Sequence, residues 1–259
     1  MKKIILIFYL IASAALAQKN IEVKYAVFFS KSELEGSLAF NQKEMYFQLM
    51  NPDVTSQHKF DLNRVSNDKL IITEKSLERS LISEIYKKAT NDYYTLNFPA
   101  ESKEIRNVYD NVPDIAWEII PDSKKEILGF VCQKAIALFR GSKVVAYFTS
   151  EIPTVFGPAK FGGLPGLILE INDVTPGYSN SYTAYEINFD SDNKLKEIKK
   201  TDATIDYQAF RKEADAKAQK RANAFLRKIR ANSPRGFRTE KEGKQKRSGF
   251  EKKFEWEKK

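Results

Sequence analysis

Side chains suited to nucleophilic catalysis are scarce in this chain of 259 residues, which has one cysteine and one histidine. Cys132 and His58 would have to meet to form a Cys–His dyad, and a Ser–His–Asp triad would also depend on His58. Cys132 stands close to Phe130 and Ile136 in an apolar run, whereas a reactive thiol needs an electropositive, partly exposed position. We therefore interpret Cys132 as a core residue and His58 as a surface residue, and we predict no catalytic residue.

A metal site in this chain could use only oxygen ligands, because one Cys and one His exclude an ordinary zinc site. Asp190 and Asp192 have the spacing that begins a calcium-binding loop, but Leu195 replaces its glycine and Thr201 replaces its final glutamate. A hairpin turn is the better interpretation, and we expect neither a metal nor a cofactor. The 26 carboxylates of residues 18–205 leave a carboxylate-dependent hydrolase open, although no spacing selects a pair.

Positive charge is concentrated at the C-terminal end. Residues 206–259 contain 18 Lys and Arg against 8 Asp and Glu, whereas residues 18–205 contain 23 basic and 26 acidic residues. Such a basic tail could dock on an anionic polymer or a membrane surface, and a solvated helix face would explain the same pattern. No specific nucleic-acid partner is expected.

The first seventeen residues have the three parts of a secretory signal peptide. Lys2 and Lys3 precede a short apolar run at residues 4–11, and Ala15-Leu16-Ala17 forms a cleavage site. We expect cleavage near Ala17 and a periplasmic or secreted product without a transmembrane segment. An exported chain with a single cysteine either buries it or uses it between molecules, and burial suits its apolar neighbours.

One segment has an unusual density of glycine and proline. Three prolines and four glycines fall within residues 151–166, so the backbone there is expected to have a fixed, irregular shape. It could be a rigid crossover that leads a strand into the core, or a rim that contacts an envelope ligand or protein. For the second case the candidate binding residues are Pro158, Phe161, Gly163, Leu164, Pro165 and Gly166.

The body of the chain reads mainly as strands. Alternating apolar residues predict strands at residues 21–29, 45–49, 94–98, 115–119 and 185–189. Residues 130–139 and 144–148 are expected to pair through a turn at residues 140–143. Residues 167–171 are almost continuously apolar, so both faces of that strand should be covered. A return strand is expected at residues 195–198.

Two segments have helical spacing. Leu77, Leu81 and Ile85 predict a short helix within residues 76–88. Apolar residues at spacings of three and four predict a longer one over residues 206–232, ended by Ser233-Pro234. After it, a flexible basic tail is expected, whose end at residues 250–256 could add a strand to a sheet edge.

Residues 163–168 spell GLPGLI, and the chain resembles the GLPGLI family of exported proteins from Bacteroidetes-type bacteria. The flanking residues fit the same pattern, among them Trp117-Glu118-Ile119, residues 127–135 and Tyr147-Phe148-Thr149. The resemblance covers about residues 117–189. It implies an exported, β-rich protein of uncharacterised function, with no activity, cofactor or catalytic residue to transfer.

Together these patterns predict a signal peptide (1–17), a mainly β domain (18–205), an amphipathic helix (206–232) and a basic tail (233–259). The β domain is expected to be an antiparallel curved sheet or half-barrel. Such a sheet offers an apolar groove, so the expected function is a non-catalytic binding module for a lipid, peptide or envelope partner. Phe210 and Phe225 of the helix could cover that groove as a lid. Docking through the basic tail and a hydrolase are the alternatives.

Overall fold

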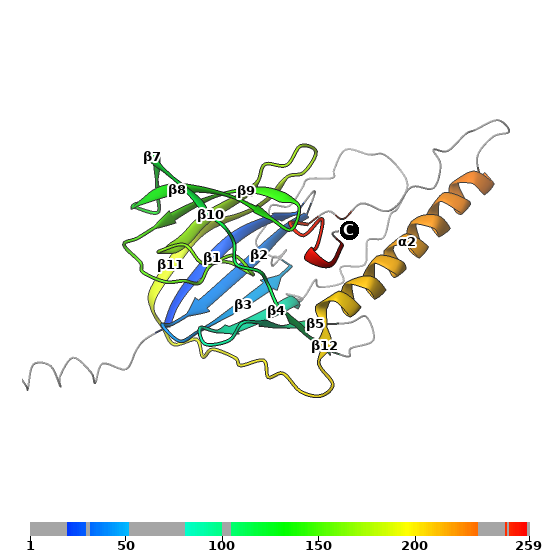
Figure 1. Cartoon of the computed structure of the whole chain (residues 1–259), viewed down its shortest axis with the longest axis horizontal. Coiled ribbons are helices and arrows are strands. Elements are labelled where there is room, and N and C mark those ends of the chain that lie inside the picture. The colour runs from blue at the N-terminus through cyan, green and yellow to red at the C-terminus, as the bar shows by residue number, and fades with distance from the viewer. Residues whose placement is uncertain are drawn as a thin grey trace, which may run out of the picture.

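The computed structural model describes residues 20–29, 32–51, 81–99, 105–232, 247 and 249–257. The described chain is mainly β, with one long helix near its C-terminal end (Figure 1). The predicted signal peptide and His58 lie outside the described residues. The elements are β1 (Asn20–Phe29), β2 (Ser32–Phe40), β3 (Glu44–Met50), β4 (Leu81–Lys88), β5 (Tyr94–Pro99), β6 (Ile105–Asp110), β7 (Glu118–Ile127), β8 (Phe130–Phe139), β9 (Ser142–Thr149), β10 (Leu167–Asp173), β11 (Asn180–Ser191), β12 (Ile205–Asp206), α2 (Tyr207–Asn232) and the 3₁₀ turn η1 (Glu255–Glu257).

The strands form one sheet from two antiparallel meanders. Its order is β12-β6-β5-β4-β3-β2-β1-β11-β10-β9-β8-β7. The chain runs outward from β1 to β6, crosses to the opposite edge at β7, and returns through β8, β9 and β10 to β11. There β11 pairs with β1 over most of its length, for example Val23 with Ile187, and joins the two meanders. Only the short β12 is parallel to its neighbour, β6.

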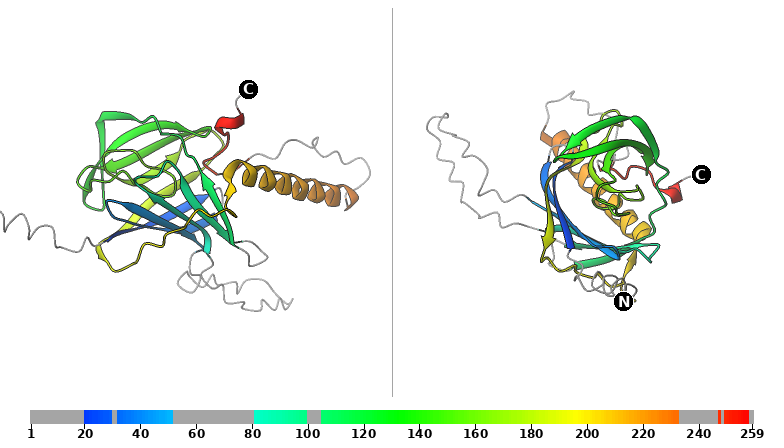
Figure 2. Two further views of the ribbon diagram at one scale, coloured as in Figure 1. Left: turned by 60° about the horizontal axis from the view of Figure 1, so that its bottom comes forward. Right: turned by 90° about the vertical axis from the view of Figure 1, so that its left-hand side faces the viewer.

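The crossover from β6 to β7 requires the sheet to be strongly curved. The two strands are ten strand spacings apart, so a flat sheet would separate them by about 48 Å. Residues 111–117 connect them, and a chain of that length reaches at most about 28 Å. The sheet therefore curls around a concave face (Figure 2), and the prediction of an antiparallel curved sheet or half-barrel is confirmed.

The concave face carries the hydrophobic core. Alternate residues of β1, Val23, Tyr25 and Val27, are fully buried, as the period-two pattern requires. In β10 the three successive residues Leu167, Ile168 and Leu169 are all buried, because both faces of this strand are covered. The prediction for residues 167–171 is thus confirmed.

The helix predicted within residues 76–88 is wrong where the structure describes it, because residues 81–88 form β4. Both faces of β4 are buried, which hides the alternation of a strand. Ile85 faces the core, while Tyr86 packs with Tyr46 and Ile198 on the outer face. The return strand predicted at residues 195–198 is also wrong: this segment has no strand structure and covers the outer face of β3 and β4.

The long helix predicted over residues 206–232 is confirmed as α2, and a side chain caps its first turn. Asp206 accepts a hydrogen bond from the Gln208 backbone N–H at 2.8 Å, satisfying one of the free donors of the first turn. Near its start the helix packs on the sheet through Phe210, whose ring stacks on Phe98 at 4.6 Å. From there α2 extends away from the sheet (Figures 1 and 2), and Phe225 is 64% exposed. Phe210 thus contacts the sheet edge, whereas Phe225 does not cover the groove.

The end of the chain returns to the sheet. Residues 249–257 form no strand, so the predicted edge strand at residues 250–256 is wrong. The segment instead enters the opening of the curved sheet, where Phe250 and Phe254 are buried in the core. The segment ends in the 3₁₀ turn Glu255–Glu257, where Trp256 stacks on Phe254 at 4.5 Å.

Candidate functional site: a buried charge cluster beside an apolar cleft

A buried ion pair joins two parts of the sheet that are far apart in strand order. Asp110 ends β6, and Arg140 lies in the tight turn between β8 and β9. The Arg140 guanidinium donates two hydrogen bonds to the Asp110 carboxylate, at 2.7 and 2.8 Å, and both side chains are almost wholly buried. A buried bidentate pair of this kind is strong and geometrically specific.

Lys160 adds a second buried cation to the same carboxylate. It comes from the glycine- and proline-rich loop before β10, and its ammonium lies 2.7 Å from Asp110. The ammonium also sits 3.7 Å from the centre of the Tyr207 ring. Burial lowers the pKa of Lys160, but the charges of Glu251 and Asp110 outweigh it, so the pKa is raised and the ammonium stays charged.

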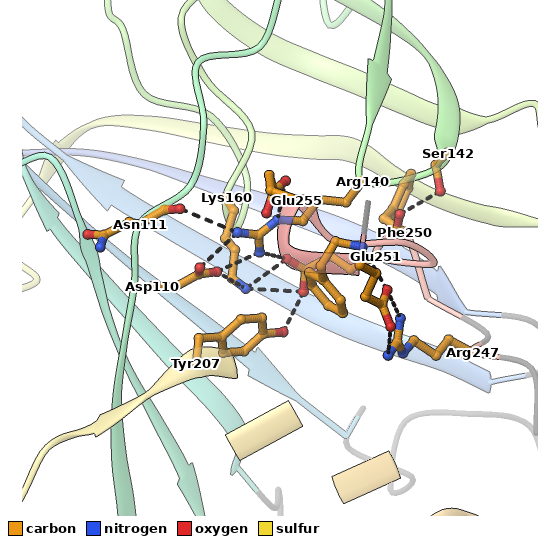
Figure 3. Close-up of polar contacts among 12 residues, drawn as sticks. Asp110, Asn111, Arg140, Ser142, Lys160, Tyr207, Arg247, Phe250, Glu251 and Glu255 are labelled. Carbon is orange, nitrogen blue, oxygen red and sulfur yellow. Dashed lines mark hydrogen bonds and ion pairs between the residues drawn. The ribbon is translucent and has the colours of Figure 1, made fainter. Parts of the chain in front are cut away.

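Glu251, from the C-terminal segment, neutralises the two cations (Figure 3). Its carboxylate accepts hydrogen bonds from Lys160 at 3.0 and 3.1 Å, from the Tyr207 hydroxyl at 2.5 Å, and from Arg140. Burial raises the pKa of Glu251, yet the charges of Lys160 and Arg140 prevail and hold it at about 2. The cluster therefore brings the cations of Arg140 and Lys160 together with the carboxyl groups of Asp110 and Glu251.

An apolar cleft of about 1270 Å³ lies beside this cluster. The concave face of the sheet, the first half of α2 and the C-terminal segment form its walls. Its lining is mostly aliphatic and aromatic and includes Phe29, Leu49, Leu96, Tyr182, Ala214 and Phe250. Eight charged residues add polar groups to the wall: Lys160, Arg211, Asp215, Arg247, Glu251, Lys252, Lys253 and Glu257. A mostly apolar cleft with polar groups in its wall is a common form of ligand site.

The structure separates the six candidate residues of the glycine-rich loop. Phe161 is buried and lines the cleft, and Leu164 is buried in the core. Pro158 and Gly166 are buried within the loop, whereas Gly163 and Pro165 are exposed. The loop thus contributes one of the six to the cleft wall.

Close backbone contacts explain the glycines of this loop. A Cβ atom at Gly166 would lie 2.1 Å from the Thr149 carbonyl oxygen, and one at Gly162 would lie 2.5 Å from that of Val155. No side chain fits at such distances. The loop shape in turn places Lys160 in the charge cluster and Phe161 in the cleft.

Neither Glu251 as a general acid nor Cys132 as a nucleophile has the pKa that the role requires. A general acid needs a raised carboxyl pKa, whereas that of Glu251 is lowered. Cys132 is fully buried, as predicted, and burial raises the pKa of its thiol to about 11. Within the described ranges, no three His, Cys, Asp or Glu residues are grouped as metal ligands.

Sequence patterns did not single out Asp110, Arg140, Lys160 or Glu251. These residues lie 20 to more than 100 positions apart, so no spacing connects them. One signal was available: Lys160 stands between Ala159 and Phe161 in an apolar loop, and a lysine in such a place needs a partner if it is buried.

The fold and the site define a class: an open, curved antiparallel sheet with an apolar cleft on its concave face and a buried charge cluster at the opening. Among the described residues, no helix has the length and apolar character needed to cross a membrane.

Comparison with known proteins adds a family of unknown function. The family model named Porph_ging, a protein of unknown function, matches residues 138–170, which include Arg140 and Lys160. No curated protein matches the chain. Structures of PNGF-II in two space groups, C2 and P21, are similar with TM-scores of 0.44 and 0.45 and 15% sequence identity. The alignments cover 73% and 75% of this chain but 31% and 32% of those chains, so this chain spans about a third of their length.

Proposed function

We propose that this protein is a non-catalytic binding module that acts after export and holds the apolar part of a lipid or peptide in the cleft. The observation that carries the proposal is the cleft itself, about 1270 Å³ with a largely aromatic and aliphatic wall. Burying a ligand there removes apolar surface from water on both partners, which is the main driving force for such binding.

A neutral fluorescent probe tests this function. We expect 1-aminoanthracene to bind the full chain with increased emission. Ala214→Trp adds a large side chain to the cleft wall and should weaken binding at least tenfold. The matched control is Ala224→Trp, on an exposed face of the same helix, which should bind like the wild type.

Two results would contradict the proposal: an unchanged emission with the wild-type chain, or equal binding by both tryptophan variants. Native mass spectrometry of the purified protein adds an independent measurement. A co-purified lipid or peptide that is lost in Ala214→Trp would identify the natural ligand class.

A second function, docking on an anionic polymer of the cell envelope, is supported by the distal half of α2. From residue 217 to residue 230 this helix contains Lys and Arg but no acidic residue. Phe225 is exposed among the charges. Binding should weaken steeply with salt, because it would rest on screened charge attraction.

Heparin-column elution measures this docking. The triple variant Lys220→Gln, Arg227→Gln, Lys228→Gln should elute at distinctly lower salt than the wild type, and Lys24→Gln on the sheet should not. Equal elution of the triple variant and the wild type would remove docking through α2. The third alternative, a carboxylate-dependent hydrolase, has less support because Asp110 and Glu251 are both tied to cations.

A further inference from the structure

The last described segment of the chain, Gly249–Glu257, is held in the sheet opening much as a bound peptide is held by a receptor. Its backbone is fixed at three points. The N–H groups of Lys252 and Lys253 both donate to the Arg140 carbonyl at 2.8 Å, and Ser142 donates its hydroxyl to the Phe250 carbonyl at 2.5 Å. These contacts set the position of the segment along the opening.

An aromatic pocket receives the first anchor, Phe250. Its ring stacks on Tyr182 at 5.6 Å and meets the edges of Phe161 at 5.0 Å and Phe29 at 6.1 Å. The side chain is 5% exposed. An aromatic anchor in a desolvated pocket is the usual centre of binding energy at an interface.

Charged and polar side chains bind the next two residues of the segment, Glu251 and Lys252. Glu251 fills a socket made by Arg140, Lys160 and the Tyr207 hydroxyl. Without it, Lys160 would share Asp110 with Arg140, whose other carboxylate partner, Glu255, is partly exposed and 3.3 Å away. The socket therefore requires a carboxylate. Lys252 is bound beside it, to Ser142 at 2.5 Å and to Asp173.

A second aromatic anchor completes the pattern. Phe254 is fully buried, with the guanidinium groups of Arg247 at 4.8 Å and Arg140 at 5.0 Å from its ring centre. Trp256 stacks on its other side at 4.5 Å. The opening thus contacts four of the five residues of the sequence Phe-Glu-Lys-x-Phe, and an aromatic side chain is buried at each end.

The segment reaches this place from a distance. By its length, α2 extends about 39 Å from Tyr207, which touches Glu251, to Asn232. Residues 233–246 connect its end to Arg247, which pairs with Asp215 in the third turn of the helix. Apart from the contact of Arg247 with Phe254, these contacts are made by residues of the segment itself, so an identical segment from another molecule would satisfy them.

We infer that the sheet opening is a recognition site for a Phe-Glu-Lys-x-Phe peptide, and that the same segment of a second copy of this chain occupies it by exchange. In the structure the chain's own segment fills the site. Exchange replaces each contact by its equal, so it costs little apart from the entropy of association. The covalently attached segment competes at an effective concentration of about 1 mM, so exchange is expected at high protein concentration. The site shares Phe29, Phe161 and Tyr182 with the cleft wall, so the experiments below use protein without an added cleft ligand.

A labelled synthetic peptide of residues 249–257 tests recognition. In the full chain carrying Phe250→Ala and Glu251→Gln, the attached segment is weakened, and we expect the peptide to bind at least tenfold more tightly than it binds the wild-type chain. A peptide with Glu251→Gln should bind the same variant at least tenfold more weakly. Equal affinity of the two peptides, or of a scrambled peptide of the same composition, would overturn the inferred recognition.

Exchange itself is tested with the wild-type chain, which avoids any folding defect of the variant. Unlabelled and ¹⁵N-labelled proteins are mixed at high concentration, diluted, and measured by native mass spectrometry. Mixed dimers are expected from the wild type, and none from a Glu251→Lys pair, whose segment cannot enter the cationic socket. Wild-type monomers alone, or mixed dimers that persist with Glu251→Lys, would overturn the second copy as the occupant.

Discussion

Arg140 and Asp110 form a bidentate, buried ion pair between strands near opposite edges of an open sheet. Asp110 ends β6, next to the terminal β12, while Arg140 follows β8, next to the terminal β7. No backbone pairing between β6 and β8 holds these strands together. The ion pair, with Lys160, thus supplies a direct contact across the gap that the curvature leaves.

Removal of one partner should therefore be costly. Asp110→Asn leaves Lys160 with Glu251, and Arg140 with Glu251 and the partly exposed Glu255, as counter-charges. Breaking a buried pair typically costs about 3–5 kcal/mol of unfolding free energy. Urea unfolding at pH 7 measures the loss. Lys24→Met is the matched control, because the Lys24–Glu186 pair is partly exposed and should contribute about 1 kcal/mol or less. Similar losses in both variants would show that burial of the Asp110 pair adds nothing.

Acid should weaken the binding of the C-terminal segment, Gly249–Glu257, to the sheet opening. The pKa of Glu251 falls from an ordinary 4.5 to about 2 in the folded protein, under the charges of Lys160 and Arg140. A lowered folded pKa stabilises the protein above the unfolded pKa, and this stability is lost as the pH falls from about 4.5 towards 2.

The loss from Glu251 should be on the order of 1 kcal/mol between pH 7 and pH 3.5. Glu251→Gln cannot titrate at this position, so its unfolding free energy should fall by that much less over the same interval. Other carboxylates titrate alike in both proteins and cancel in the comparison. If the unfolding free energies of the two proteins changed equally with pH, ionisation of Glu251 would not be coupled to folding.

Strands whose apolar residues alternate in the sequence were predictable. β1, β3 and β5 alternate and were identified, although Tyr46 of β3 and Thr95 of β5 are also buried on the outer face. β4 is buried on both sides, because Ile198 and its neighbours cover the outer face, and its leucine and isoleucine spacing therefore resembled a helix. The same cover explains the failed return strand at residues 195–198, which packs on the sheet face instead of pairing at an edge.

The charge cluster could not be predicted, because its members meet only through the curvature of the sheet. Asp110 and Arg140 are ordinary turn residues until β6 and β8 approach each other. Glu251 belongs to a charged C-terminal stretch whose composition indicated a flexible tail. Its burial depends on Phe250 and Phe254, two aromatic anchors that outweigh the polar character of their neighbours.

Two substitutions in the glycine-rich loop separate the cost of a close contact from the cost of an unfavourable backbone conformation. Gly166→Ala places a Cβ 2.1 Å from the Thr149 carbonyl oxygen, so the backbone itself must move, and a loss of more than about 3 kcal/mol is expected. Gly163→Ala, in the same loop, has open space but a φ of +83°, and should cost about 1–2 kcal/mol. Thermal or urea unfolding compares the two. If Gly163→Ala lost more unfolding free energy than Gly166→Ala, the backbone at Gly166 would be able to move away from Thr149 at little cost.

Alkylation can be followed at a single site in this protein, because Cys132 is the only thiol in the chain. Its side chain is fully buried on β8, and desolvation raises its pKa to about 11, so at pH 8 about one thiol in a thousand is ionised. We expect iodoacetamide at pH 8 to leave the folded protein unmodified for hours and to add one carbamidomethyl group within minutes in urea, as mass spectrometry measures. The Asp110→Asn variant adds a further comparison: if its weakened sheet opens locally, the alkylation rate should rise about tenfold for each 1.4 kcal/mol of lost free energy of opening. Rapid modification of the folded wild-type protein would mean that β8 is accessible from solvent, against the burial of Cys132 in the core.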